Sequence, residues 1–421
     1  MHARGAGAEW LELLRGFDLA EAAPRSAADS SVTDARILLE RAGLVAFAAE
    51  AKAEGHPLTV VVNDHHRYTD TRPFIDAVLA VLDSMPVVGG RPPVRILVAT
   101  GTHPSGRLER AAHEERIAAP YLARIDEIEW HDSDGDDLVA VGDYRFHRWL
   151  GGHGYYLACG SMEPHYFAGV TGAHKSLTVG VMARASIERN HAHAMSPDVA
   201  PLKLDGNPVH AGIVAALGTL ESKGAHLLAL NQVIVGGRVV AATAGHPLQA
   251  LADGLPAVHA SFAHRVAQPL DIVIARVGAP LDRDLYQADK GIKNTEAAVR
   301  DRGVLIVEAE CRNGVGIRHF VELLEQAPTY RAAREVVERR GYRLGDHKAV
   351  RLRALTDVRG VRVALVSANI DAAMAHVLGM EIFRDRAAAA RWARDELDGM
   401  AVPRGLVVED AGNLALELRA R

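Results

Sequence analysis

Cysteine is nearly absent from this sequence: only Cys159 and Cys311 occur among 421 residues. Two isolated cysteines exclude a disulfide framework, a cysteine-rich zinc site and an iron–sulfur cluster. Histidine, by contrast, is plentiful, with 21 residues. Any metal chemistry is therefore expected to use imidazole and oxygen ligands.

Long hydrophobic runs and an excess of positive charge are also lacking. No apolar run reaches the ~18 residues of a membrane span, and Met1–Gly16 has no apolar signal core. The net charge is -5, from 48 basic and 53 acidic residues, which leaves no basic footprint for nucleic acid. We therefore expect a cytoplasmic protein that binds neither nucleic acid nor a membrane.

Short apolar runs alternate with amphipathic stretches along most of the chain, and this alternation predicts α/β folding with mostly parallel sheets. Among the predicted strands are Leu58–Asn63, Val94–Thr100, Ile272–Val277 and Val304–Ala309. Predicted helices include Phe74–Met85, Leu108–Ala118, Asn207–Leu220 with Asn207 as its cap, and Thr295–Asp301. A Gly-Gly turn at 236–237 predicts a hairpin over Leu227–Val240.

The pattern restarts near residue 267, which predicts two α/β domains. We assign 1–266 to the first domain and 267–399 to the second, with 400–421 as a segment that can return to the first. In open α/β sheets, ligands bind beyond the carboxyl ends of the strands. Asp64–Arg67 and Gly101–His103 each follow a predicted strand, so functional residues are expected there.

Two segments suggest alternative functions. Gly169–Ser176 nearly matches the phosphate-binding loop of NTPases, but His174 stands where that loop needs glycine for its backbone nest. Asp64, His65 and His66 resemble the opening of the DHH phosphoesterases, which bind manganese. A metal-dependent, DHH-like phosphoesterase therefore stays open as the alternative function.

A third pattern covers more of the chain. Asp64 and Arg67 end one strand, and Gly101-Thr102-His103 ends another. His165 precedes Lys175 by ten residues, and Asn190-His191 follows that lysine by sixteen. The later run Tyr286-Gln287-Ala288-Asp289-Lys290-Gly291 completes the series. Together these pieces resemble the nickel-pincer-nucleotide lactate racemases and their wider family of 2-hydroxy-acid racemases and epimerases.

The resemblance implies two α/β domains with the active site in the cleft between them. It also implies a cofactor, the nickel complex of pyridinium-3,5-bisthiocarboxylic acid mononucleotide, joined to Lys175 through a thioamide. His191 would be its metal ligand, since imidazole suits nickel. It is preferred to the rival His193 because it follows Lys175 by sixteen residues and comes directly after Asn190. Enzymes that make and insert the cofactor are the implied partners.

In this family, inversion at the α-carbon proceeds by reversible hydride transfer, which requires a base for the hydroxyl proton of each enantiomer. His103 and His165 are the matching pair, since imidazole can act as acid or base near neutral pH. The substrate carboxylate needs cations and hydrogen-bond donors. The residues expected to bind substrate are Asp64, Arg67, Tyr286, Gln287 and Lys290.

We expect lactate-like acids first and malate-like acids second. A second carboxylate would need a further cation, and Arg72 is expected to be paired with Asp70 instead. His65, His66 and Tyr68 would crowd the same strand end and favour a short side chain. No role is assigned to His174, His347 or Lys348.

Overall fold

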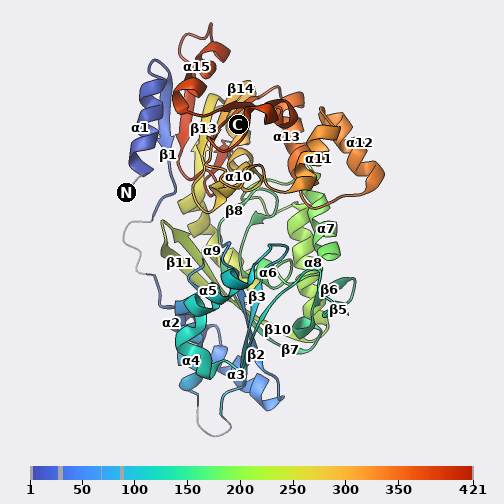
Figure 1. The fold of residues 1–421 in the computed structure, drawn as a ribbon. Helices are drawn as coiled ribbons and strands as arrows, with labels where there is room; N and C mark the ends of the chain where they lie inside the picture. The colour runs from blue at the N-terminus through green and yellow to red at the C-terminus, as the bar shows by residue number, and fades with distance from the viewer. Residues whose placement is uncertain (1–2, 27–31, 68, 86–89, 420–421) are drawn as a thin grey trace.

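The computed structural model describes residues 3–26, 32–67, 69–85 and 90–419. These residues form two α/β units, each built around a six-stranded sheet, and Figure 1 shows one unit above the other. Tyr68 lies outside the described residues. The predicted fold class, α/β with mostly parallel sheets, is confirmed.

The first sheet has the strand order β11-β10-β7-β2-β3-β4. Its strands are β2 (Leu58–Asn63), β3 (Val94–Ala99), β4 (Glu127–Trp130), β7 (Gly154–Ser161), β10 (Ala225–Val235) and β11 (Arg238–Gly245). All neighbours are parallel except β10 and β11, which form an antiparallel hairpin. The hairpin turns at Gly236 and Gly237, whose φ values of 57° and 76° suit glycine.

Helices cover both faces of this sheet, as its continuous apolar strands require. Alternate residues of β2 point to opposite faces: Val60 and Val62 belong to one buried cluster and Val61 to another. The covering helices are α2 (Ala35–Arg41), α3 (Leu44–Ala53), α4 (Thr71–Asp83), α5 (Arg107–Ala118), α8 (Pro208–Ser222) and α9 (Pro247–Phe262). Asn207 caps α8 as expected, accepting hydrogen bonds from the backbone N–H of Val209 and His210.

The second sheet has the order β1-β17-β13-β14-β15-β16, and every neighbouring pair is parallel. Its strands are β1 (Asp18–Ala22), β13 (Leu270–Arg276), β14 (Val299–Glu308), β15 (Arg362–Val366), β16 (Glu381–Phe383) and β17 (Arg404–Val408). The helices α1 (Ala3–Leu13) and α15 (Arg386–Glu396) pack together beside it, the blue and red helices at the top of Figure 1.

The ends of the chain do not follow the sequence-based division. Residues 18–22 form β1 of the second sheet although they precede residue 266, and β17 fills the position between β1 and β13. The last strand, β18 (Ala415–Leu418), pairs with β12 (Ala263–Val266). In β1 only Ala22 is buried, so the strand carries no alternating apolar signal. The boundary near 266 itself remains a prediction.

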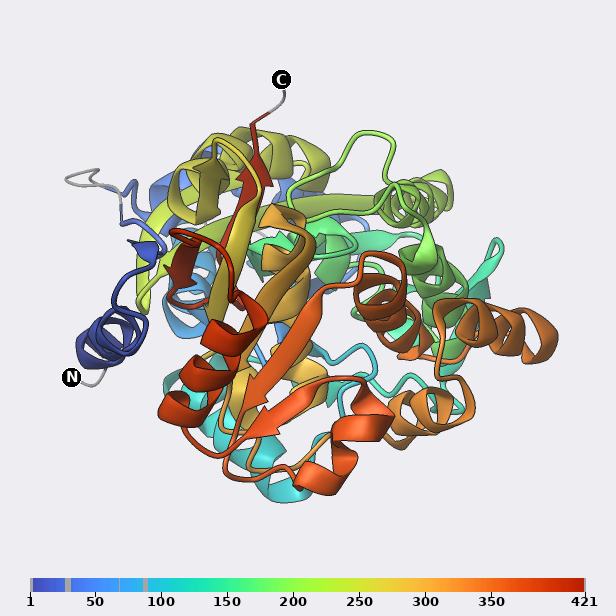
Figure 2. The same ribbon diagram turned by 90° about the horizontal axis from the view of Figure 1, so that it is seen from above.

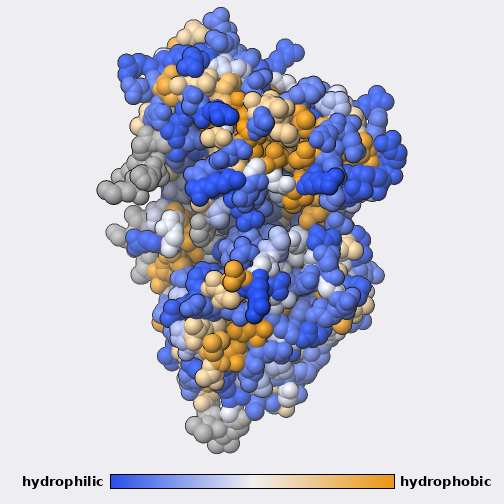
Figure 3. Space-filling model, viewed as in Figure 1, coloured by the Kyte–Doolittle hydropathy of each residue, from blue (hydrophilic) through white to orange (hydrophobic). Residues whose placement is uncertain are grey.

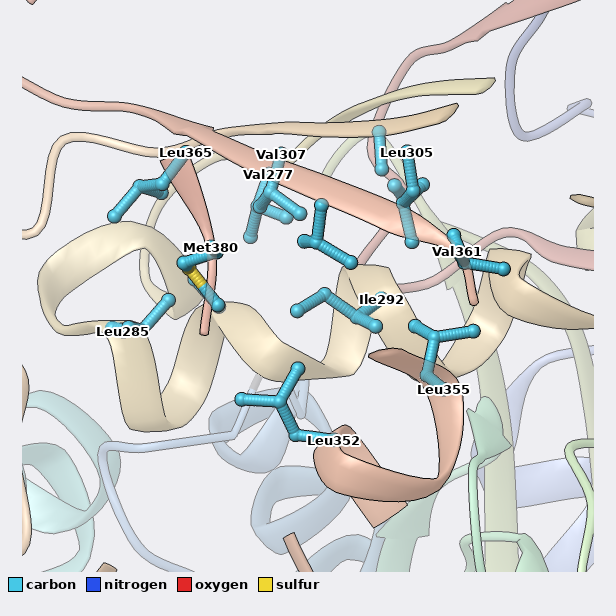
Figure 4. Close-up of a cluster of buried hydrophobic side chains, with 14 of the residues drawn as sticks. Val277, Leu285, Ile292, Leu305, Val307, Leu352, Leu355, Val361, Leu365 and Met380 are labelled. Atoms are coloured by element: carbon cyan, nitrogen blue, oxygen red, sulfur yellow. The ribbon is translucent and has the colours of Figure 1, made fainter. Parts of the chain in front are cut away.

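The predicted helix Thr295–Asp301 is wrong, because α10 spans Leu285–Thr295 and β14 begins at Val299. The Asp284 side chain caps α10 by accepting the N–H of Gln287 at 2.8 Å. Leu285 and Ile292 face the core under the sheet, as Figure 4 shows. Helix α10 therefore carries an apolar face and, between those positions, a polar one.

The remaining elements pack around the two sheets. They include β5 (Leu138–Val141), β6 (Tyr144–His147), β8 (Pro164–His165), β9 (Gly169–Val170), α6 (Ala173–Ser176), α7 (Arg184–Ala192), α11 (Arg318–Gln326), α12 (Tyr330–Arg340) and α13 (Asp346–Arg353). Figure 2 shows the orange helices α11–α13 beside the green segment that holds α7. One link there is the Leu344 N–H, which donates to Glu188 Oε1 at 3.1 Å.

The face of the molecule in Figure 3 is largely hydrophilic, with hydrophobic residues gathered in smaller patches on both units. Within the described residues, none of the helices has the length and apolar character needed to cross a membrane.

Candidate active site

A cavity of about 650 Å³ lies between the two units, where the cleft was expected. Its walls include the carboxyl ends of β2, β3 and β7 from the first unit, and α10 and α13 from the second. The structure brings together in this cavity all nine predicted residues: Asp64, Arg67, His103, His165, Lys175, His191, Tyr286, Gln287 and Lys290.

His103, which is partly exposed, and the buried Asp64 form a hydrogen-bonded pair because β2 and β3 are parallel neighbours that end side by side. The Nδ1 atom of His103 lies 2.8 Å from Asp64 Oδ2, and Asp64 Oδ1 accepts the His66 N–H at 3.0 Å. Burial works to raise the pKa of Asp64, but the His103 ring and its hydrogen bond outweigh it, and the pKa is lowered. Burial lowers the pKa of His103, and Asp64 opposes this. The carboxylate thus holds Nδ1–H and leaves Nε2 as a base.

His165 and Lys175 form the second pair, with 2.9 Å between His165 Nε2 and Lys175 Nζ. The backbone N–H of Ala168 donates to His165 Nδ1 at 3.3 Å, so the ring proton sits on Nε2 and is donated to the amine. Burial, then the charges of Arg67 and Lys290, holds the pKa of Lys175 well below its usual range. Because the His165 Nε2–H is donated to Lys175 Nζ, that nitrogen acts as an acceptor, which requires the neutral amine, the form that acts as a nucleophile.

His191 presents a free ring nitrogen to the same cavity. Its Nδ1–H donates to Asn190 Oδ1 at 3.2 Å, and the Asn190 amide is fixed because its Nδ2 donates to Val209 O at 3.0 Å. The Nε2 lone pair is left for a ligand, which is the usual arrangement of a metal-binding histidine. Burial and nearby Lys175 lower the pKa of His191 to about 3, so the ring is neutral. His193 is exposed and does not line the cavity.

Arg67 is engaged by a residue that the sequence reasoning missed. Arg67 Nη1 donates to Glu163 Oε1 at 3.1 Å, and both side chains are largely buried. Lys290 lies near this pair, and burial followed by the Arg67 charge lowers its pKa to about 7. Lys290 is then about half protonated near neutral pH, and an anion bound beside it would favour its charged form.

Tyr286 and Gln287 line the cavity from the start of α10, one turn before Lys290. Lys348 fixes this helix to α13: its Nζ donates to the Tyr286 carbonyl at 2.6 Å and to Asp289 Oδ2 at 3.3 Å. The ammonium group also lies 4.4 Å from the centre of the Tyr286 ring. These contacts make Lys348 a support for the cavity wall.

His347 links the two units at the wall of the cavity. Its Nε2 lies 2.7 Å from the hydroxyl of Tyr166 and its Nδ1 2.7 Å from that of Tyr342. His174 differs, because it is fully buried and neither ring nitrogen has a hydrogen-bond partner within the described part of the chain. Burial, followed by the nearby His210, lowers the pKa of His174 to about 3.

The metal-site alternative depends on Asp64, His66 and His103, whose ligand atoms lie within 4.8 Å of one another. Arg283 Nη1 lies 3.0 Å from His66 Nδ1, and His66 Nε2 lies 3.3 Å from Pro104 O. Since a guanidinium only donates, Nδ1 accepts and Nε2–H donates to the carbonyl. Both nitrogens of His66 are engaged in hydrogen bonds. A DHH-like metal site therefore has less support than the site formed by the nine predicted residues of the cavity.

The fold and cavity define a two-unit α/β protein with its site between the units. Two family models match the chain: the lactate racemase N-terminal domain over residues 36–200 and the lactate racemase C-terminal domain over residues 266–404. The chain belongs to the lactate racemase family.

Curated relatives include two proteins named lactate racemase. The protein of Thermoanaerobacterium thermosaccharolyticum is 29% identical over 291 residues, which is 65% of each chain. The protein of Lactiplantibacillus plantarum is 28% identical over 63% of this chain and 62% of its own length. The matched segments thus span less than two thirds of these relatives.

Solved structures show the same fold. The lactate racemase apoprotein of Thermoanaerobacterium thermosaccharolyticum has a TM-score of 0.79 at 23% identity, covering 97% of this chain and 96% of its own. A protein of Thermotoga maritima has a TM-score of 0.64 at 14% identity, covering 89% and 97%.

Proposed function

We propose that this protein is a racemase or epimerase of a small 2-hydroxy acid that depends on a nickel-pincer nucleotide attached to Lys175. The observation that carries the proposal is the gathering of Lys175, His191, His103 and His165 in one cavity. The relatives named lactate racemase support the same activity. We further propose that the protein works in the cytoplasm and receives its cofactor from dedicated biosynthetic enzymes.

The residues fit such a group. Lys175 is a partly buried amine that contacts a histidine instead of a carboxylate, so its acylation would leave no buried acid unpaired. The free Nε2 of His191 is the kind of donor that nickel accepts. When bound, the group supplies a reversible acceptor for the α-hydrogen of the substrate as hydride. Lys175 would hold it covalently and His191 would bind its nickel.

The protein must then move the hydroxyl proton. His103 Nε2 would accept it from one enantiomer, and Asp64 would stabilise the imidazolium that forms. His165 would serve the other enantiomer. In the free protein the Nε2–H of His165 is engaged by the Lys175 amine. Acylation of Lys175 delocalises that lone pair, so the Nε2–H of His165 would be free to donate to the substrate oxygen. To act as a base at the same atom, His165 would have to carry its ring proton on Nδ1 instead.

The substrate carboxylate would bind between Arg67 and Lys290, with Gln287 as a further donor. Arg67 comes from the first unit and Lys290 from the second, so one bound carboxylate joins the two. This arrangement orients the α-carbon and excludes water around the exchanging hydrogen.

The test is to produce the protein together with cofactor-making enzymes and to measure its intact mass, nickel content and racemisation of single enantiomers. The expected result is a nickel- and sulfur-containing adduct on Lys175 and racemisation of C3–C5 2-hydroxy acids. Lys175→Ala should lose both, whereas the exposed Lys52→Ala is the matched control and should keep both. A nickel-loaded protein that racemises no 2-hydroxy acid would contradict the proposal.

A further inference from the structure

A small recess opens from the main cavity beside the proposed reaction centre. Its volume is about 20 Å³, and Arg67, His103 and Lys290 line both it and the cavity. Such a volume admits roughly one water-sized group, for example one oxygen of a carboxylate. Because the recess shares Arg67 and Lys290 with the main cavity, it lies where the side chain of a substrate held by these two residues would extend.

The outer wall of the recess is polar and positively charged. It includes His66 and Arg283, together with the apolar Pro280 and Leu281. Arg283 lies on the short turn before α10 and comes from the second unit, whereas His66 follows β2 in the first. A methyl side chain would make no use of a guanidinium group at this point.

Arg283 is held in place with donors to spare. Its Nη1 donates to His66 Nδ1 at 3.0 Å, and its Nε forms an ion pair with Asp284 Oδ2 at 3.3 Å, which leaves Nη2 for a further carboxylate. Within the described residues, the Nη2 atom makes no hydrogen bond to the protein. Burial and the neighbouring His103 lower the pKa of His66 to about 4, so His66 is a neutral acceptor that orients the guanidinium.

The distribution of cations matches two carboxylates. Arg67 and Lys290 serve the first, next to His103 and His165. A second carboxylate requires another cation, and Arg283 supplies one at the recess. Arg72, the arginine that the sequence first suggested for this role, is exposed on α4 and does not line the cavity.

We propose that Arg283, oriented by His66, is a specificity-determining residue that binds a second carboxylate, so the substrates are short 2-hydroxy dicarboxylic acids such as malate. The reaction of these substrates, racemisation, rests on the proposed function. The binding of a second carboxylate by Arg283 does not. A guanidinium–carboxylate contact is bidentate and charge-assisted, which makes it selective for a dicarboxylate over a monocarboxylate of similar size.

The test uses calorimetric binding of each enantiomer of malate and lactate to the purified full-length chain without cofactor. We expect malate to bind about tenfold or more tightly than lactate, as one charged hydrogen bond provides. Arg283→Met should remove that preference and leave lactate binding unchanged, and Arg283→Lys should retain part of it. Arg72→Met is the matched control and should behave as the unaltered chain.

Unchanged lactate affinity in Arg283→Met also shows that the variant is folded. Equal binding of malate and lactate by the unaltered chain, or a malate preference that survives Arg283→Met, would overturn the inference. Racemisation by the loaded enzyme separates the two proposals. A malate preference without any racemisation would refute the proposed function alone, and racemisation of lactate without a malate preference would refute the subsite alone.

Discussion

Replacing Asp64 by asparagine tests the assignment of His103 as a base. The Asp64 carboxylate lies 2.8 Å from His103 Nδ1 and is itself 1% exposed, so no water replaces it. A hydrogen bond to a charged group contributes about 1.5–3 kcal/mol. This contact strengthens when the ring becomes an imidazolium, so its loss should lower kcat/KM about 10- to 150-fold.

The direction of the pH effect is also fixed. Asp64 opposes the effect of burial on the pKa of His103, so Asp64→Asn should lower that pKa further. The acid limb of the kcat/KM profile should move to lower pH, because a weaker base stays unprotonated there.

The assay follows optical rotation from each pure enantiomer with cofactor-loaded enzyme. The equilibrium constant between mirror images is unity, so the loss in kcat/KM must be equal in both directions. The hydrogen bond between Asn190 and His191 and the nickel content should be unaffected, since Asp64 makes no contact with His191 among the described residues. Full activity in Asp64→Asn, with an unshifted acid limb, would refute the role of the pair.

The remaining predictions concern Lys175 and His174, whose pKa values burial lowers. Because burial holds the pKa of Lys175 well below its usual range, a small acetylating reagent at pH 7 should modify Lys175 in the cofactor-free chain before the exposed Lys52. Peptide mass spectrometry would show the reverse order if the amine were charged. His174 has a pKa of about 3 in the folded chain and about 6.5 when unfolded, so it stabilises the fold fully above pH 6.5 and this contribution is lost as the pH falls from 6.5 towards 3. His174→Leu should therefore reduce the slope of unfolding free energy between pH 6.5 and 4 by about 1.4 kcal/mol per pH unit, and an unchanged slope in chemical denaturation would contradict this.

Much of the candidate site could be predicted because its residues follow strands or have fixed spacing. Asp64 and His103 come directly after two apolar runs, and parallel neighbours place such residues at one sheet edge. The helical face of Tyr286 and Lys290 was not predicted, since the helix was placed ten residues too late. The apolar positions of α10 are interrupted by polar ones, which weakens the sequence signal.

Other features depend on contacts between distant segments. Glu163 pairs with Arg67 across 96 residues, and Arg283 reaches His66 across 217. No local periodicity or motif predicts such pairs, because each partner, taken alone in the sequence, is expected to be a solvent-exposed polar residue. The placement of β1 in the second sheet is of the same kind, since its register is set by β17, near the other end of the chain.

The most direct test of the central claim uses one enantiomer of a 2-hydroxy acid carrying deuterium at the α-carbon. Cofactor-loaded enzyme in ordinary water would racemise it, and the mirror-image product would be isolated and examined by mass spectrometry and NMR. The account predicts that the product keeps its α-deuterium, because the same hydrogen is removed as hydride and returned. Replacement of the deuterium by solvent hydrogen would show proton abstraction instead and would contradict the account.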